Sequence, residues 1–124
     1  MKTPNGSPKQ KGDEGEELAA QYLAGRGYRI IARQWKYERY ELDLIVGRDN
    51  MLVFVEVKTR YSNVYGEPWE AVNNSKRKKI CISADAYIRQ YNCAQEPRFD
   101  IISIIKSGSR SEIIHIEQAF WPMA

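Results

Sequence analysis

Residues 41–59 contain two apolar segments separated by a short polar turn, and this arrangement restricts the fold more than any other feature of the sequence. The segments Glu41 to Val46 and Met51 to Thr59 are rich in Val, Leu and Ile, and Gly-Arg-Asp-Asn at 47–50 is typical of a hairpin turn. Side chains alternate between the two faces of a strand. One predicted face of the pair is wholly apolar, namely Leu42, Leu44 and Val46 with Met51, Val53, Val55 and Val57. Near the turn, the sheet is therefore expected to be buried on both faces.

Charged side chains gather on the other face, at the end far from the turn. Glu41 and Asp43 alternate along the first strand, and Glu56 and Lys58 along the second. A turn centred on residues 49–50 places Asp43 opposite Glu56 and Glu41 opposite Lys58, and a register slip of one residue would separate them. Two interpretations are open at this point: a salt-bridged square without a ligand, or a site for a divalent cation that offsets the repulsion between the carboxylates.

Hydrolysis of a phosphodiester requires residue types that this cluster supplies. Mg²⁺ binds carboxylate oxygens, keeps several waters and takes substrate phosphates as further ligands. It also lowers the pKa of an attacking water. Asp43 and Glu56 are therefore candidate ligands for Mg²⁺ or Mn²⁺. Lys58, two residues after Glu56 on the same face, can contact the phosphate or orient the water.

The flanking segments predict an α/β fold. A helix is expected to begin at Asp13 as N-cap and to be stopped by Gly25 and Gly27. Asn73, Asn74 or Ser75 can cap a second helix that runs to about Tyr91. Further strands are predicted at 28–35, 98–105 and 112–119, with a loop at 60–68. The order αβββαββ predicts one mixed sheet of about five strands flanked by helices. Residues 1–11 are predicted to be a disordered tail, and 12–124 a single domain.

Composition narrows the class of protein further. The 124 residues carry a net charge of +3, which permits a polyanionic partner without requiring one. Cys81 and Cys93 form no zinc motif with the lone His115, so we expect structural thiols in a reducing compartment. No apolar run approaches the roughly 20 residues needed to span a bilayer. We therefore expect a soluble cytoplasmic protein without a membrane partner.

Other side chains are candidates for contact with nucleic acid. Lys76, Arg77, Lys78 and Lys79 open the second predicted helix and could contact phosphates, although a solvated helix face is the alternative. Arg60 and Tyr61 directly follow the strand that carries Glu56 and Lys58, and they are further candidates. Tyr65 and Trp69 could stack on a base, but such aromatic residues more often cover the edge of a core. Asp100 is expected to be structural, paired with Arg98 or Lys106. His115 is expected to be packed or exposed rather than catalytic.

Several blocks of the chain resemble the YraN-like family of bacterial proteins, in order and spacing. They are GEELAAQYL, GYRIIARQW, ELDLI, VFVEVKTR, YGEPWEAVNNSKRKKI and RFDIISI, and together they span about residues 12–120. This resemblance implies the restriction-endonuclease-like fold of the PD-(D/E)XK superfamily. The superfamily signature, an Asp followed on the next strand by Glu-x-Lys, falls on Asp43 and on Glu56, Val57 and Lys58. Tyr40 stands where the family usually has glycine.

The resemblance also implies a function. The family is similar to archaeal Holliday junction resolvases, whose extra acidic residue on the first helix corresponds to Glu16. It implies an endonuclease acting on DNA, with branched or damaged DNA as candidate substrate and a homodimer by analogy. The implied catalytic residues are Asp43, Glu56, Lys58 and Glu16; the implied metal ligands are Asp43, Glu56, Glu16 and Val57; Glu41 supports them. The alternatives are a non-cleaving nucleic-acid-binding module and a protein-interaction subunit with a structural acidic cluster.

Overall fold

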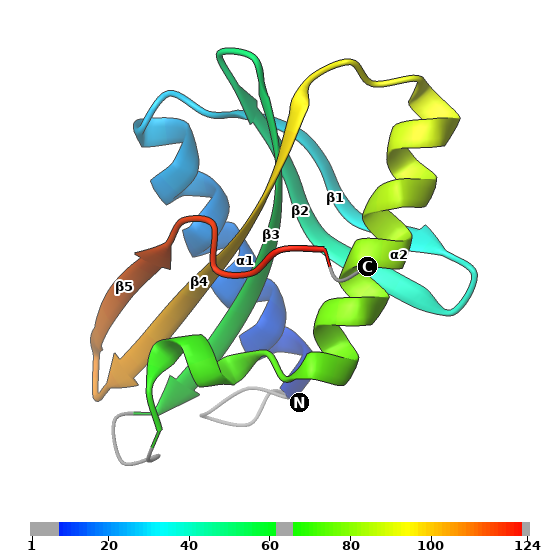
Figure 1. Ribbon diagram of the computed structural model, residues 1–124. Helices are drawn as coiled ribbons and strands as arrows, with labels where there is room; N and C mark the ends of the chain where they lie inside the picture. The colour runs from blue at the N-terminus through cyan, green and yellow to red at the C-terminus, as the bar shows by residue number, and fades with distance from the viewer. Residues whose placement is uncertain (1–7, 62–65, 123–124) are drawn as a thin grey trace.

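The protein has a five-stranded sheet with one helix on each face, as the computed structural model of residues 8–61 and 66–122 shows (Figure 1). The elements are α1 (Pro8–Gly25), β1 (Arg29–Tyr37), β2 (Tyr40–Arg48), β3 (Met51–Tyr61), the short 3-10 helix η1 (Pro68–Ala71), α2 (Asn74–Tyr91), β4 (Glu96–Ser107) and β5 (Arg110–Ile116). The strands follow one another across the sheet in sequence order. β3 and β4 are parallel, with α2 between them along the chain, and the other neighbours are antiparallel. The predicted fold class and the order αβββαββ are confirmed.

The hairpin between β2 and β3 turns where the sequence predicts. Arg48 pairs with Met51, so only Asp49 and Asn50 form the turn, and the register continues to Leu44 opposite Val55. Asp49 has a φ of 54°, a left-handed conformation that Asp tolerates better than most residues do. This register fixes which side chains of the two strands face each helix.

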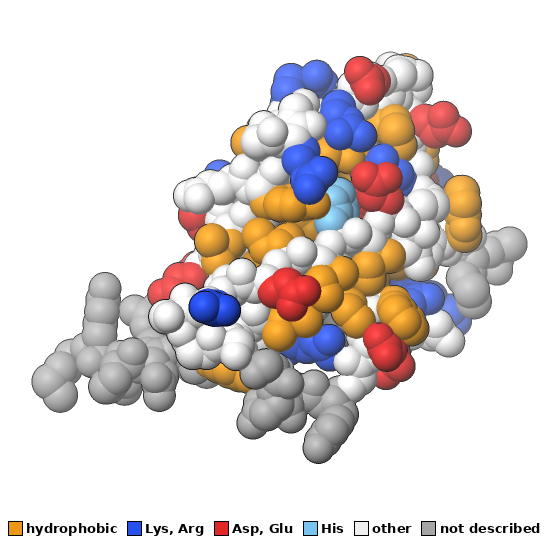
Figure 2. Space-filling model, turned by 90° about the vertical axis from the view of Figure 1, so that its left-hand side faces the viewer, with side chains coloured by type: hydrophobic (Ala, Val, Ile, Leu, Met, Phe, Trp, Pro, Cys, Tyr) orange, Lys and Arg blue, Asp and Glu red, His pale blue; other side chains and the backbone are white. Residues whose placement is uncertain are grey.

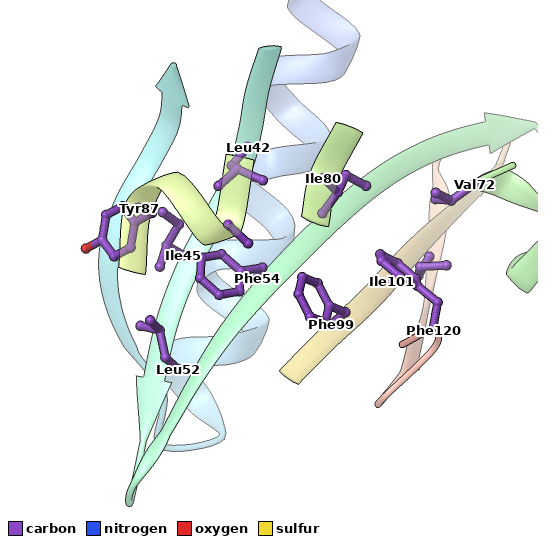
Figure 3. Close-up of a cluster of buried hydrophobic side chains, with 11 residues drawn as sticks. Leu42, Ile45, Leu52, Phe54, Val72, Ile80, Tyr87, Phe99, Ile101 and Phe120 are labelled. Carbon is purple, nitrogen blue, oxygen red and sulfur yellow. The ribbon is translucent and has the colours of Figure 1, made fainter. Parts of the chain in front are cut away.

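Two apolar clusters cover the opposite faces of the sheet. On one face, Leu44 and Val55 pack with Leu23 of α1. On the other, Ile45 and Phe54 belong to a cluster with α2, which Figure 3 shows. Each fully buried side chain of this size contributes roughly 1.5–3 kcal/mol relative to an exposed one. The two-sided burial predicted from the apolar segments is therefore confirmed.

Leu42 departs from the predicted alternation. It was expected on the face of Leu44, but it belongs to the α2 cluster together with Ile45. Pairing of β2 with β3 ends at Leu44, whereas β2 remains paired with β1 as far as Tyr40. β1 carries a register shift between Ile30 and Ala32, and such bulges increase the local twist of a strand pair. Beyond Leu44 the β1–β2 ribbon is thus free to twist away from β3.

Helix α1 begins earlier than the sequence suggested. It starts at Pro8, five residues before Asp13, so Asp13 lies inside the helix and is not its N-cap. Proline is favoured in the first turn because that turn needs no backbone N–H. Residues 8–11 of the predicted tail are therefore helical, and residues 1–7 lie outside the described part of the chain.

The later elements agree with the prediction within a few residues. Asn73 caps α2, because its side-chain oxygen accepts a hydrogen bond of 2.9 Å from the backbone N–H of Lys76. The predicted loop at 60–68 begins later, since β3 continues to Tyr61; residues 62–65 are not described. Both cysteines are free thiols, as expected. Neither helix of the described chain combines the length and the apolar character needed to cross a bilayer.

Candidate metal and phosphate site

The separation of β2 from β3 creates a cleft. Their pairing ends at Leu44 and Val55, yet β3 remains paired with β4 as far as Tyr61. The space between the diverging strands and the two helices is a cavity of about 600 Å³. It is lined by Asp13 and Glu16 of α1, Gln34 and Lys36 of β1, Glu41 and Asp43 of β2, Glu56, Val57, Lys58 and Thr59 of β3, and Lys76 of α2. The predicted Asp, Glu and Lys thus face one cavity.

Asp43 lies where the two strands separate. Its Oδ2 accepts a hydrogen bond of 2.8 Å from the backbone N–H of Val57. This contact bridges β2 and β3 just beyond the end of their backbone pairing. Burial, followed by the charge of Glu56, raises the pKa of Asp43 from 3.8 to about 7. An ionised Asp43 is therefore costly in the metal-free protein.

Glu16 and Glu41 complete an acidic group around Asp43. One carboxylate oxygen from each of the three residues lies within 4.8 Å of the others. Burial is also the main cause that raises the pKa of Glu16, from 4.5 to about 7, with Asp43 and Glu41 adding to it. Glu16 thus occupies the position expected for it. Its neighbour Glu17 faces solvent as expected and pairs there with Arg33.

The predicted pairing of Glu41 with Lys58 is wrong. Glu41 lies opposite Lys36 of β1, because β2 follows β1 after it has left β3. Lys58 is exposed at the cleft and, among the described residues, forms no ion pair. Its ammonium group is therefore available to a ligand in the cleft.

Glu56 forms an ion pair that the sequence did not predict. Its side chain is only 4% exposed, and its Oε1 lies 2.5 Å from Nζ of Lys76 on α2. The sequence placed Lys76 among the phosphate-binding residues, but in the structure it neutralises a buried carboxylate. A buried carboxylate is costly unless it is paired, so Lys76 stabilises Glu56 in its position.

The other predicted basic contacts divide into two kinds. Arg60 and Arg77 are held by backbone carbonyls: Arg60 donates to Gly66 O, and Arg77 donates to Val72 O at 2.9 Å. Lys78 and Lys79 are exposed on α2, and Tyr61 and Trp69 are 44% and 52% exposed. Tyr65 lies outside the described residues. The lysines therefore remain accessible to a phosphate backbone, whereas the two arginines support the loop.

Sequence reasoning missed Gln34 and Gly15. Gln34 donates hydrogen bonds to Glu16 at 2.6 Å and to Asp13 at 3.1 Å, which it reaches with a φ of 49° inside β1. Gly15 is buried against β3, and a Cβ at this position would collide with Oγ1 of Thr59. A glycine inside a predicted helix was the available signal of close packing. The conformation of Gln34 left no signal in the sequence.

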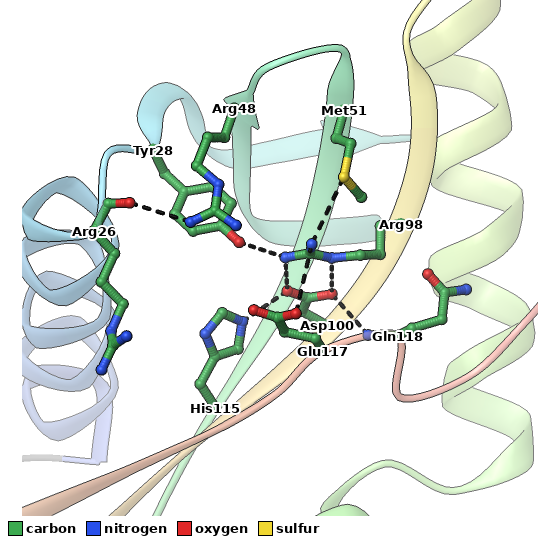
Figure 4. A network of polar contacts seen from close by, with 9 residues as sticks. All are labelled: Arg26, Tyr28, Arg48, Met51, Arg98, Asp100, His115, Glu117 and Gln118. Carbon is green, nitrogen blue, oxygen red and sulfur yellow. Dashed lines mark hydrogen bonds and ion pairs between the residues drawn. The ribbon is translucent and has the colours of Figure 1, made fainter.

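A second polar cluster lies away from the cleft, at the ends of β4 and β5 (Figure 4). Asp100 is fully buried and accepts two hydrogen bonds from Arg98, at 2.7 and 2.8 Å. His115 Nε2 lies 2.7 Å from Asp100, and the ring packs edge-on against Tyr22. Burial raises the pKa of Asp100, but these hydrogen bonds outweigh it and leave the pKa below its usual value. Asp100 is structural and His115 packed, as expected; Lys106 pairs with Glu14 instead.

The surface on the α1 and β5 side contrasts with the cleft. Figure 2 shows that basic, acidic and apolar side chains are interspersed on this face. Such a mixed surface offers a polyanion no continuous positive track. Carboxylates are instead gathered in the cleft.

The donor set of the cleft fits a hard divalent cation. Asp43, Glu16 and Glu41 bring carboxylate oxygens together, and these are ligands that Mg²⁺ and Mn²⁺ prefer. Glu56 lines the same cleft, but its carboxylate is paired with Lys76. Val57 has no ligating side chain, so it could contribute only its backbone carbonyl. No histidine or cysteine lines the cleft among the described residues. A soft-metal site of the zinc-thiolate kind is therefore not supported.

The fold and the acidic cleft define a small mixed α/β protein that gathers carboxylates at the open end of its central hairpin. The chain belongs to the uncharacterised protein family UPF0102, whose model matches residues 15–104. A UPF0102 protein of Phocaeicola vulgatus is 42% identical over 111 residues, which cover 90% of this chain and 92% of the relative. One from Prosthecochloris aestuarii is 40% identical over 121 residues, covering 92% and 95%. The resemblance to the YraN-like family is confirmed.

Proposed function

We propose that this protein is a Mg²⁺- or Mn²⁺-dependent endonuclease that hydrolyses DNA phosphodiester bonds, with branched or damaged DNA as the substrate. The observation that supports it best is the carboxylate group in the cleft. The oxygens of Asp43, Glu16 and Glu41 lie within 4.8 Å of one another, and the pKa values of Asp43 and Glu16 rise to about 7. Perturbed carboxylates gathered in a cavity are typical of functional sites, because nothing in folding alone rewards their repulsion.

The residues of the cleft have distinct roles in this proposal. Asp43, Glu56 and Glu16, with the carbonyl of Val57, would hold the cation, and Glu41 would support them. A bound Mg²⁺ or Mn²⁺ supplies charge stabilisation at the phosphate and a more acidic attacking water. Lys58 cannot ligate a cation, because an ammonium group offers donors only. It is exposed at the same cavity and would hold the phosphate or orient the water.

Binding of DNA is expected to rely on phosphate contacts. Lys78 and Lys79 extend from the first half of α2, the helix whose Lys76 lines the cleft. The described residues show no element shaped to read base edges, so the affinity would be largely independent of sequence. We expect the protein to act in the cytoplasm and, by analogy with resolvases, as a homodimer.

A non-cleaving nucleic-acid-binding module of the same fold is the second candidate. The ion pair between Glu56 and Lys76 favours it, because part of the acidic charge is already neutralised without a metal. Asp43, Glu16 and Glu41 argue against it, since their uncompensated charge would repel a polyanion. Metal binding and metal-dependent cleavage separate the two functions.

The test is a cleavage panel of linear, flapped and four-way DNA with Mg²⁺, Mn²⁺ or EDTA. Glu56→Ala should lose the cleavage, whereas Glu112→Ala, an exposed glutamate on β5 outside the cleft, should retain it. Cleavage that persists in Glu56→Ala or in EDTA would refute the proposal. Metal-independent DNA binding without cleavage would favour the second candidate.

A further inference from the structure

The counter-ion of Glu56 lies on a flexible side chain whose backbone is held in place. The backbone N–H of Lys76 donates to the capping side chain of Asn73, at 2.9 Å, so the first turn of α2 is anchored. The side chain of Lys76 is 43% exposed, whereas that of Glu56 is 4% exposed. Lysine has four rotatable carbon–carbon bonds in its stem, so its ammonium group can leave Glu56 without any movement of the helix.

A divalent cation and the ammonium group of Lys76 compete for the same carboxylate. Lys76 Nζ lies 2.5 Å from Glu56 Oε1, so its ammonium group occupies space that a cation bound to this oxygen, at roughly 2.0–2.6 Å, would need. Two like charges this close repel strongly unless water screens them. The charge of Lys76 also acts on Asp43, the other candidate ligand at this position. A cation bound to this carboxylate oxygen would therefore displace the ammonium group of Lys76.

The displaced ammonium group remains within reach of an incoming substrate. Lys76 lines the cleft together with Lys58, and both side chains extend toward solvent from the elements that enclose it. A phosphodiester bound at the cleft would bring negative charge to this position. An ammonium group released from Glu56 would then find a new counter-ion in the phosphate.

We propose that Lys76 is an exchangeable counter-ion: it neutralises Glu56 in the metal-free protein and transfers to a substrate phosphate when a divalent cation binds. This inference rests on the proposed metal site. Lys76 would thus weaken binding of metal alone while strengthening binding of DNA and metal together. A purely structural ion pair would not change these two affinities in opposite directions.

The test compares three variants of the full-length chain. Lys76→Gln removes the charge but keeps an amide donor for Glu56, which limits any loss of folding. Lys76→Arg keeps the charge. Lys106→Gln is the matched control, because Lys106 also loses an ion pair, with Glu14, but lies outside the cleft. Circular dichroism establishes that each variant is folded.

Titration calorimetry with Mn²⁺ at about pH 8 measures the first affinity. Lys76→Gln should bind Mn²⁺ about tenfold more tightly than the wild type, since one unit charge near the cation is removed. Lys76→Arg and Lys106→Gln should remain close to the wild type. In Ca²⁺, which binds the same oxygen ligands, Lys76→Gln should bind a short DNA duplex several-fold more weakly. The slope of log affinity against log salt should fall by about one.

Each outcome decides a separate question. Equal Mn²⁺ affinity in Lys76→Gln and the wild type would overturn the inference while leaving the metal site intact. Tighter Mn²⁺ binding with unchanged DNA affinity would refute the transfer to phosphate. A wild-type protein that binds no Mn²⁺ would refute the proposed function, and the inference with it.

Discussion

Replacement of Asp43 by Asn is expected to stabilise the metal-free protein at alkaline pH. Burial, together with the charge of Glu56, raises the pKa of this carboxyl to about 7, so its ionisation opposes folding. Asn keeps an oxygen that can accept the hydrogen bond of 2.8 Å from the backbone N–H of Val57. The substitution therefore removes the charge while it preserves the contact that holds the side chain.

The size of the effect follows from the pKa. A rise from 3.8 to about 7 corresponds to a cost of at most about 4.5 kcal/mol above pH 7, at roughly 1.4 kcal/mol per unit. The side chain of Asp43 is partly exposed to water in the cleft, and screening by this water halves the expected cost of ionisation to about 2 kcal/mol. For a domain of this size, 1 kcal/mol shifts the Tm by roughly 3–5 °C. The variant should melt about 6–10 °C above the wild type.

The pH dependence has a definite sign. Because the pKa in the folded state is raised, the cost is absent below about pH 4 and grows as pH rises toward about 7. The advantage of Asp43→Asn should thus be large at about pH 8 and shrink to about a third at about pH 5. Saturating Mn²⁺ should reverse the order, because the wild type gains binding energy that the variant lacks.

Thermal melts at both pH values, in EDTA and in Mn²⁺, measure these differences. Asp85→Asn is the matched control, since Asp85 is exposed on α2 and its substitution should change stability by less than about 0.5 kcal/mol. If Asp43→Asn melts below the wild type in EDTA at about pH 8, the reasoning from burial and repulsion is refuted. If Mn²⁺ raises the Tm of both proteins equally, Asp43 is not a ligand.

Three further predictions concern the cleft and its support. Lys58→Ala should abolish cleavage but largely spare Mn²⁺ binding measured by calorimetry, whereas Glu56→Ala should weaken both. If Lys58→Ala cleaves as fast as the wild type, this lysine has no catalytic role. DNA affinity, followed by fluorescence anisotropy, should fall steeply with salt, and a nearly salt-independent affinity would contradict binding through phosphates. Gly15→Ala should destabilise the protein by about 1–2 kcal/mol in urea, because its Cβ collides with Thr59, despite the better helix propensity of Ala; a stabilised variant would show that α1 is free to shift.

Much of the fold could be predicted because it depends on neighbours in the sequence. The alternation of residues 41–46 and 51–59, with a turn at Asp49 and Asn50, determined the register of the central hairpin. The start of α2 was predicted to within three residues, because a cap and its helix are adjacent, and Asn73 is the cap among the three candidates. The start of α1 was not predicted, since its first residues, from Pro8, offer few apolar side chains to indicate a helix.

The acids of the candidate site were visible in the sequence, but their partners were not. Asp43, Glu56 and Lys58 could be placed on one face from strand alternation together with the turn expected at residues 49–50. Glu41 was assigned to Lys58 on the assumption that β2 and β3 remain paired, and the early end of their pairing made that assignment wrong. Strand separation depends on twist accumulated across the sheet, which two segments by themselves do not specify.

The sequence by itself determined the apolar hairpin and the acidic and basic residues at its open end. Only the tertiary structure decided which charges meet, because α1 and α2 pack on opposite faces of the sheet and both reach the same cleft. Glu16 approaches Asp43 from one helix, and Lys76 approaches Glu56 from the other. These contacts join residues far apart in the chain, and their geometry follows from the packing of whole elements rather than from any local pattern.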